Sequence, residues 1–144
     1  MLVCDVMTRD VRTVAPDATL LSAAQAMASL GVGGLPVSDG KQLLGMLTDR
    51  DIVVRGLASA KDQHAKVAEC MSGEVAYVYE DEDTKAALSR MRALQIRRLI
   101  VLRRDKTLAG IVAIGDIATE PDAATCDQVG GALARISDPS SPRK

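Results

Sequence analysis

The residues best suited to ligand chemistry lie in the run GMLTDRD at positions 45–51. At Thr48, where a helix is predicted to begin, a hydroxyl and the free backbone N–H groups can together hold a phosphate. Asp51 follows nearly one helical turn later and can accept hydrogen bonds from a ribose diol, while Arg50 can add a charge-assisted contact to the phosphate. The same run equally fits a threonine N-cap with acidic first-turn residues, which needs no ligand. Both interpretations stay open on this segment alone.

Residue sets that could support catalysis or bind a metal are sparse in the sequence. The one histidine, His64, lies in a polar stretch, and Cys4, Cys70 and Cys126 are widely separated without C-x-x-C spacing. General acid–base and nucleophilic catalysis need paired groups that this pattern does not offer, so the sequence predicts a protein that is not an enzyme. The number and spacing of the cysteines argue against a disulfide framework and a zinc site. The acidic run at 80–83 is interpreted as a turn and helix start, so no metal is expected.

The composition excludes several further function classes. Of the 144 residues, 47% are hydrophobic and 26% are charged, as in ordinary globular proteins. With two Tyr and no Phe or Trp, the chain lacks the rings on which single-strand nucleic-acid modules stack bases. A net charge of −1 supplies no field for gathering a polyanion or an anionic membrane. There is no apolar stretch of about 18 residues and no basic-then-apolar start, so a cytoplasmic protein is expected.

The elements that must position the candidate residues occur twice, because the chain contains an internal repeat. An offset of 64 positions aligns the two copies as far as Val37, and an extra loop residue then changes the offset to 65. The aligned pairs keep their residue type in order: Met7/Met71, Val14/Val78, Asp17/Asp81, Met27/Met91, Leu35/Leu99, Gly45/Gly110 and Asp51/Asp116. This duplication is the most specific feature of the sequence, and it marks the four methionines as core residues.

Each copy is predicted to form a strand, a helix, two strands and a second helix. The first copy has a strand at 11–14, a helix at 20–30 capped by Asp17 or Thr19 and stopped by Gly31, an antiparallel strand pair at 35–37 and 43–47, and a helix from Thr48. The second copy has the same elements at 76–79, 84–95, 98–102, 108–112 and from Ile114.

The remaining segments connect or end these copies. Residues 61–66 form a polar link in which His64 is expected to be solvated, and residues 120–122 close the second copy. A terminal helix is predicted at 126–136, followed by a loose tail at 137–144 that is rich in Ser and Pro.

The duplicated unit resembles the cystathionine-β-synthase (CBS) domain, and two in tandem resemble a Bateman module. The first copy carries matching segments at 5–8 (DVMT), 16–19 (PDAT), 33–37 (GGLPV) and 45–51, and the second at 71–72 (MS), 81–83 (DED), 98–101 (RLIV) and 110–116 (GIVAIGD). Each motif is loose, but their order is kept twice. The chain most resembles small stand-alone bacterial two-CBS proteins of the hypoxic response protein 1 type.

The resemblance implies an α+β fold of two CBS repeats, each β-α-β-β-α, packed with pseudo-twofold symmetry. It places repeat 1 at 1–60, repeat 2 at 61–122, and a C-terminal helix and flexible tail at 123–144. It also implies a homodimeric regulatory protein that signals to an unknown protein partner through a conformational change. The ligand implied is AMP, ADP, ATP or S-adenosylmethionine, bound in the cleft between repeats.

Carried over position by position, the resemblance makes Thr48 the phosphate-side hydroxyl and Asp51 the ribose carboxylate. The backbone and apolar wall around adenine match six residues: Thr13, Val14, Val32, Gly34, Leu35 and Pro36. The second copy keeps Asp116, but Ala113 replaces the hydroxyl, and Arg97 with Arg98 replaces a glycine pair. A second, weaker site is therefore expected at Tyr77, Arg98, Ile100 and Asp116.

Two other function classes remain open. A constitutive scaffold protein would keep the fold without binding a ligand. A nucleic-acid-associated protein would use the basic cluster formed by Arg97, Arg98, Arg103, Arg104 and Lys106. A solvated face with a role near the second site is the simpler interpretation of that cluster, because no recognition-helix motif accompanies it.

Overall fold

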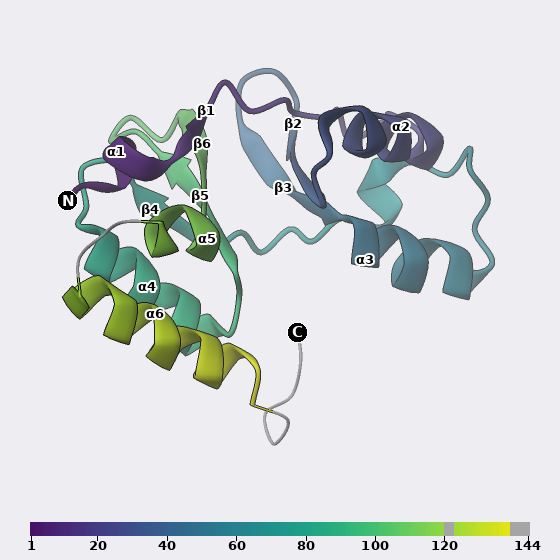
Figure 1. Cartoon of the computed structure of the whole chain (residues 1–144). Coiled ribbons are helices and arrows are strands. Elements are labelled where there is room, and N and C mark those ends of the chain that lie inside the picture. The colour runs from purple at the N-terminus through teal and green to yellow at the C-terminus, as the bar shows by residue number, and fades with distance from the viewer. Residues whose placement is uncertain (120–122, 139–144) are drawn as a thin grey trace. The chain divides into compact units, whose positions relative to one another are not determined.

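The computed structural model describes residues 1–119 and 123–138, and it divides the chain into two compact units (Figure 1). Unit 1 consists of Met1–Asp10 together with the chain from Ala76 onward, and unit 2 consists of Val11–Val75. Unit 2 therefore carries Thr48 and Asp51 from the first sequence copy, and unit 1 carries Asp116 from the second.

Unit 2 is built on helix α2 (Leu20–Leu30) and the antiparallel strands β2 (Gly34–Ser38) and β3 (Leu43–Thr48). The Thr19 hydroxyl caps α2 by accepting a 3.1 Å hydrogen bond from the Ser22 N–H, and Gly31 ends the helix with a left-handed φ of 64°. After β3 the chain turns into the short helix α3 (Asp49–Asp51), followed by a π-helical turn at Ile52–Gly56 and single 3₁₀ turns at Leu57–Ser59 and Val67–Glu69.

Most predicted elements of the first copy are confirmed, but the strand at 11–14 is wrong. Only Val14 forms a bridge there, parallel to Val37 of β2. Its N–H donates to the Pro36 carbonyl (2.9 Å), and its carbonyl accepts from the Ser38 N–H (3.0 Å). The segment thus follows β2 for one residue and leaves before a second bridge forms.

Unit 1 contains a four-stranded sheet in the order β1-β6-β5-β4. Its strands are β1 (Thr8–Arg9), β4 (Tyr77–Tyr79), β5 (Arg98–Leu102) and β6 (Leu108–Ala113), of which only the β4/β5 pair is parallel. The helices are α1 (Val3–Val6), α4 (Thr84–Leu94), α5 (Ile114–Ala118) and α6 (Ala123–Ile136). Helices α4 and α6 lie side by side in Figure 1. These elements confirm the second-copy and terminal-helix predictions, whereas β1 was not predicted.

Each unit has its own apolar core, and the sheets present alternate residues to it. The core of unit 2 gathers Leu20, Ala23, Ala26, Met27, Leu35, Val37, Leu47, Val67 and Cys70. The core of unit 1 includes Val78, Leu88, Met91, Leu99, Val101, Val112 and Ile117, together with Val129 and Ala132 of α6. Met7, Met27 and Met91 are buried as the repeat predicts, while Met71 is partly buried and packs on the core of unit 2.

The segment that precedes each copy in sequence packs in the same way in the two units. In unit 1 the Val3 N–H donates to the Glu82 carbonyl (2.9 Å). In unit 2 the equivalent Val67 N–H donates to the Ala18 carbonyl (2.8 Å). The boundaries between the compact units consequently lie at residues 10/11 and 75/76. Each unit therefore combines most of one predicted repeat, 1–60 or 61–122, with the first residues of the other.

Two equivalent glycines allow these segments to approach the sheets. A Cβ at Gly110 of β6 would collide with the Thr8 carbonyl, and a Cβ at Gly45 of β3 would collide with the Ser72 carbonyl. Both positions therefore need glycine for lack of space, not for an unusual φ.

Two sequence predictions fall at the edges of the described chain. The closing residues 120–122 and most of the predicted tail, 139–144, lie outside the described residues. Among the helices described, none combines the length and the hydropathy needed to cross a membrane.

Candidate functional site

The first candidate site lies on the face of the unit 2 sheet that points away from its core. Leu35, Val37 and Leu47 point into the core, so Gly34, Pro36, Met46 and Thr48 occupy the opposite face. Gly34 and Thr48 are direct partners in the β2/β3 register. Gly34 is buried, and a Cβ there would lie 2.8 Å from the Met46 Cε and 3.7 Å from the Thr48 Cγ2, so the absence of a side chain leaves room for the Met46 side chain beside Thr48.

Thr48 and Asp51 hold each other in a reciprocal capping box at the start of α3. The Asp51 N–H donates to the Thr48 Oγ1 (3.1 Å), and the Thr48 N–H donates to the Asp51 Oδ2 (2.9 Å). The N-cap interpretation of this run is therefore confirmed. It does not exclude a ligand, because the Thr48 hydroxyl accepts in this contact and keeps its own proton to donate.

The second carboxylate oxygen of Asp51 has a weaker contact. Asp51 Oδ1 lies 3.9 Å from the Arg55 Nε one helical turn later, and the Asp51 side chain is 17% exposed. Because this contact is long, Asp51 Oδ1 can still accept a hydrogen bond from a hydroxyl group, as the ribose-binding role requires.

The other predicted residues of this site are spread over three kinds of position. Thr13 is exposed and adjoins the Val14 bridge to β2. Val14 packs against the core, and Leu35 is only 1% exposed within it, so the side chain of Leu35 does not face the site. The apolar side chains on that face are those of Pro36 and its strand partner Met46.

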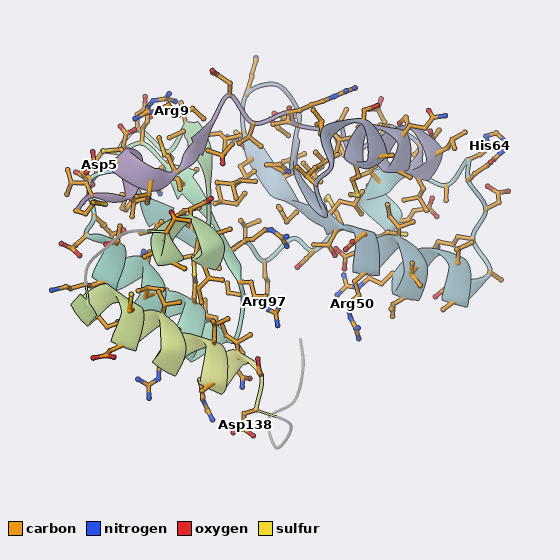
Figure 2. All side chains as sticks on the ribbon, in the orientation of Figure 1. Asp5, Arg9, Arg50, His64, Arg97 and Asp138 are labelled. Carbon is orange, nitrogen blue, oxygen red and sulfur yellow. The ribbon has the colours of Figure 1, made fainter. Side chains whose placement is uncertain are left out.

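Val32 and Arg50 lie at the margins of the site. Val32 is 42% exposed just before β2, and its N–H donates to the Met27 carbonyl at the end of α2 (3.1 Å). Arg50 is exposed on α3, and its guanidinium extends away from the ribbon (Figure 2). The described contacts do not bring Arg50 to Thr48.

The second candidate site occupies the matching face of the unit 1 sheet. Val78, Leu99, Val101 and Val112 point into the core, so the alternating residues Tyr77, Arg98, Ile100 and Ala113 share the other face. Tyr77 is paired with Ile100 across β4/β5, and Arg98 is paired with Ala113 across β5/β6.

Asp116 is the third residue of α5, as Asp51 is of α3, but only one of the two capping-box hydrogen bonds can form in α5. The Ala113 N–H donates to the Asp116 Oδ2 (2.8 Å), while Ala113 has no side-chain acceptor to return the contact. The structure thus brings Tyr77, Arg98 and Ile100 to one face of the sheet, while Asp116 contacts that sheet from α5 through the Ala113 N–H.

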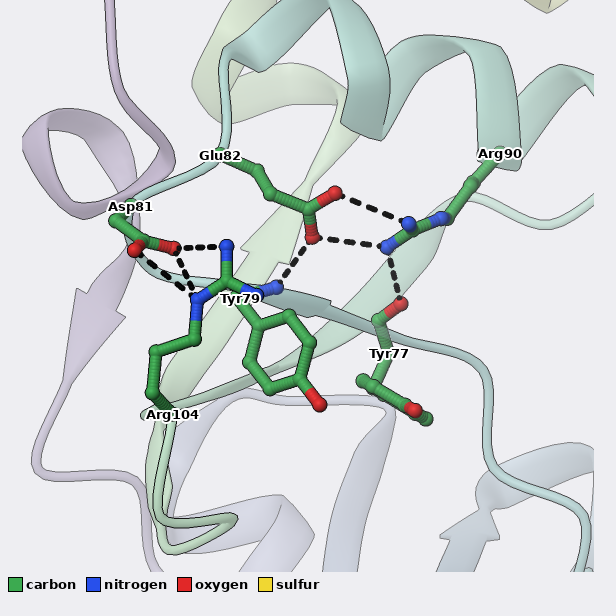
Figure 3. A network of polar contacts seen from close by, with 6 residues as sticks. All are labelled: Tyr77, Tyr79, Asp81, Glu82, Arg90 and Arg104. Atoms are coloured by element: carbon green, nitrogen blue, oxygen red, sulfur yellow. Dashed lines mark hydrogen bonds and ion pairs between the residues drawn. The ribbon is translucent and has the colours of Figure 1, made fainter.

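A polar network beside this face was not predicted from the sequence (Figure 3). Glu82 and Arg90 form a double ion pair with two 3.0 Å contacts. Arg90 also donates to the Tyr77 carbonyl (2.9 Å), and Glu82 accepts from the Tyr79 N–H (2.7 Å). Because β4 is an edge strand, the pair satisfies backbone groups that a further strand would otherwise bind.

The same network fixes the only two aromatic rings of the chain. The Tyr77 and Tyr79 rings meet edge to face with centroids 5.5 Å apart, and the Arg104 guanidinium lies 4.2 Å from the Tyr79 centroid. Asp81 in turn accepts two 3.1 Å contacts from the Arg104 Nε. A sequence signal for this cluster exists in the repeat alignment, because Tyr77 and Tyr79 are aligned with Thr13 and Ala15 of the first copy, which have no ring.

The electrostatics of these side chains follow from their contacts. The Arg104 side chain lowers the pKa of Asp81 and keeps that carboxyl ionised. Interaction with the Tyr77 hydroxyl, reinforced by desolvation, raises the pKa of Tyr79. Burial raises the pKa of the Cys70 thiol, so this cysteine stays protonated and unreactive.

The basic cluster predicted as a possible nucleic-acid surface is partly engaged within unit 1. Arg103 donates to the Leu108 carbonyl (2.7 Å), and Arg104 is held by Asp81. Arg97, Arg98 and Lys106 are exposed. Figure 2 shows the Arg97 side chain extending from the ribbon. These contacts favour a structural and solvated role for the cluster.

The described residues were also compared with the requirements of a metal site. Within 1–119 and 123–138, no group of three or more His, Cys, Asp or Glu side chains gathers in a way that could hold a metal ion. The cysteines are free thiols, with Cys4 partly buried, Cys70 buried and Cys126 exposed, and His64 is exposed in the polar link.

Comparison with known proteins identifies relatives of the whole chain. The family described as CBS domain matches residues 3–57 and again residues 67–122. The CBS domain-containing protein YhcV of Bacillus subtilis is 39% identical over 133 residues, which cover 92% of this chain and 93% of YhcV. Hypoxic response protein 1 of Mycobacterium tuberculosis is 39% identical over 116 residues, which cover 79% of this chain and 80% of that protein.

Solved structures show the same fold. A crystal structure of Hypoxic Response Protein I with two coordinated zinc ions has a TM-score of 0.77 and 36% identity, covering 85% of this chain and all of that chain. A crystal structure of CBSX2 in complex with AMP has a TM-score of 0.70 and 25% identity, covering 80% of this chain and 91% of that chain.

Proposed function

Because the chain belongs to the CBS domain family, we propose that it is a regulatory protein that binds an adenosine-containing ligand. The observation that carries the proposal is the Thr48/Asp51 pair at the start of α3, where Gly34 is the strand partner of Thr48. The complex of CBSX2 with AMP supports the ligand class, which includes AMP, ADP, ATP and S-adenosylmethionine.

The geometry of unit 2 suits the two polar ends of a nucleotide. The Thr48 hydroxyl has a proton to donate to a phosphate oxygen, and Asp51 Oδ1 has acceptor capacity for a ribose hydroxyl. Pro36 and Gly34 lie on the same face, where both are buried, and are the residues proposed to line the base side of the site. Thr13, Val14, Val32 and Leu35 complete the proposed site through their backbones and, at Val32, an exposed side chain.

Unit 1 is proposed as a second, weaker site. Asp116 keeps the carboxylate and Ile100 takes the place of Pro36, but Ala113 gives no hydroxyl for the phosphate. Arg98 supplies a cation on the same face where unit 2 has Gly34.

We further propose a signalling role without catalysis, in which the bound nucleotide changes the population of conformations that a partner protein recognises. A ligand shifts such an equilibrium only by its differential affinity for the conformations. A homodimer is the proposed assembly, carried over from the family resemblance, and the cytoplasm is the proposed location, as expected from the sequence.

A scaffold that binds no ligand is the second candidate function. The capping box favours it, because Thr48 and Asp51 already satisfy each other without a nucleotide. Metal binding is not proposed. The zinc ions belong to the structure of Hypoxic Response Protein I, and the described residues of this chain gather no comparable group.

Thermal unfolding with AMP, ATP, S-adenosylmethionine and NADH in competition separates the two candidates. A ligand at about 100 times its dissociation constant should stabilise the native state by about 2.7 kcal/mol, because it binds the folded chain only. Mass spectrometry of ligand that co-purifies with the protein would name the nucleotide. No midpoint shift with any of the four at millimolar concentration would favour the scaffold and reject nucleotide binding.

A further inference from the structure

The two tyrosines set unit 1 apart from unit 2 at the same structural position. They are the only aromatic residues among 144, and both lie on β4. Thr13 and Ala15 stand at the equivalent places in unit 2. The face that has Ala113 where unit 2 has Thr48 also has a ring, that of Tyr77, where unit 2 has Thr13.

The ring of Tyr77 is held in place by contacts on several sides. Its own carbonyl accepts from Arg90 (2.9 Å), and the Tyr79 N–H is bound by Glu82 (2.7 Å), so the strand backbone is fixed at both tyrosines. Tyr79 packs edge to face against Tyr77 at 5.5 Å and is itself covered by Arg104 at 4.2 Å (Figure 3).

Despite this support, Tyr77 remains 40% exposed. A ring that is held by its neighbours and open to solvent has little conformational freedom left to lose when a planar group stacks on it. The five other residues of the network do not close that surface in the described contacts.

The surroundings of the open ring indicate the chemistry that it would recognise. Arg98 lies on the same face and is exposed, separated from the Tyr77 register partner Ile100 by one residue that points into the core. An aromatic platform with a cation at its side fits a planar base that carries an anionic group. Unit 2 has no ring and no cation at these positions.

We propose that Tyr77 is the base-stacking and specificity-determining residue of unit 1, acting with Arg98 on a nucleotide. This inference rests on the proposed function, in which the two sheet faces bind nucleotides. Unit 1 then holds a base by aromatic stacking, whereas unit 2 holds it by backbone and aliphatic contacts. Base stacking on an aromatic residue changes affinity by about 5- to 150-fold when the ring is removed.

The tyrosine content makes a direct experiment possible. Protein labelled with ¹³C in the tyrosine rings should give separate ring signals for only two residues, and Tyr79→Phe assigns them. AMP should move the Tyr77 signal upfield through the ring current of adenine, whereas ribose 5-phosphate should not. Asp51→Ala, which alters the unit 2 site, should leave the Tyr77 shift at saturation unchanged.

Matched variants test the role of the ring in affinity. Tyr77→Leu should weaken the affinity of unit 1 for AMP by about 5- to 150-fold. Tyr77→Phe should retain this affinity, because the ring is kept. Because Tyr77→Leu also removes the ring current that Tyr77 exerts on Tyr79, an unchanged unfolding midpoint, and not the Tyr79 signal, shows that unit 1 stays folded. If calorimetry detects AMP but the Tyr77 signal does not move, the stacking role is wrong and the proposed function stands. If no AMP binds at all, both are overturned.

Discussion

Units 1 and 2 repeat the same backbone contacts at equivalent positions. They differ in the number of strands in their sheets, in helix α6 of unit 1 and in the side chains on one sheet face. Val3 and Val67 make equivalent contacts to the strand-to-helix turn of their units, at 2.9 and 2.8 Å. Asp51 and Asp116 accept from equivalent backbone N–H groups at 2.9 and 2.8 Å. The contacts that occur in both units are those that build the fold. The side chains that differ between the units lie on the sheet faces proposed to bind a ligand.

Apart from the missing hydroxyl at Ala113, unit 1 has more side-chain contacts at its sheet edge than unit 2 and a larger core. Only unit 1 has the Glu82/Arg90 pair, since Ala18 and Ala26 occupy the equivalent positions in unit 2. Helix α6 adds Val129 and Ala132 to the core of unit 1. One copy of a repeat can thus be reinforced while the other keeps a simpler sheet face.

The largest predicted effect concerns a feature that the units share. Gly110→Ala and Gly45→Ala should each destabilise the protein by up to about 3 kcal/mol, because the new Cβ meets a backbone carbonyl. Gly73→Ala is the control, since a Cβ there meets no atom within 4 Å. Denaturant unfolding measures all three. Similar losses for the first two would confirm the shared architecture, and a neutral Gly110→Ala would contradict it.

The polar network gives the next largest effect, and only in unit 1. Arg90→Met should cost about 1.5 kcal/mol, because it leaves Glu82 and the Tyr77 carbonyl without their partner at a partly exposed site. Arg92→Met, an exposed position on the same helix, should stay within about 0.5 kcal/mol of the parent chain. Equal losses from the two variants would mean that the network adds no stability.

Exchanging the cap residues tests the difference between α3 and α5. Thr48→Ala should cost about 1 kcal/mol, because it removes the acceptor for the Asp51 N–H. Ala113→Thr should add between about 0.5 and 1 kcal/mol, since the backbone of Ala113 is already extended as at Thr48. Urea unfolding of both variants gives the values. A destabilised Ala113→Thr would show that the hydroxyl has no room in unit 1.

The smallest effect is a pH dependence at Asp81. Because Arg104 lowers the pKa of Asp81 in the folded chain, this contact stabilises the native state above about pH 4 and is lost as the pH falls through the folded-state pKa. Near-UV circular dichroism of the tyrosines should report the release of Arg104 from Tyr79. Asp81→Asn should show the low-pH spectrum at neutral pH. Asp105→Asn is the control and should leave the spectrum unchanged, because the pKa of Asp105 is lowered by its contact with Thr107 and not by Arg104.

The repeat and local capping signals predict most of the fold. Thr19, Gly31 and the Asp39-Gly40 turn place α2, β2 and β3 correctly, because these signals act over a few residues. The strand at 11–14 failed because its partner β2 engages only Val14. The strand β1 was missed because its partner β6 lies far along the chain, and two residues carry no periodicity.

The candidate sites show the same division between local and distant information. The Thr48/Asp51 contact follows from a three-residue spacing, and the structure has it. The Asp81/Arg104 contact joins residues 23 positions apart, and Arg90 reaches Glu82 from the next helix. No local pattern encodes those distances, so the support of Tyr77 could be seen only once the chain was folded.

Calorimetric titration of AMP into the protein and two matched variants tests the central claim, that the units carry unequal nucleotide sites. Asp51→Ala and Asp116→Ala remove equivalent capping carboxylates, so their effects on folding are comparable. We predict two classes of site in the parent chain, with the tighter class lost in Asp51→Ala and kept in Asp116→Ala. Two equal sites, or tight binding that Asp51→Ala leaves unchanged, would contradict the account.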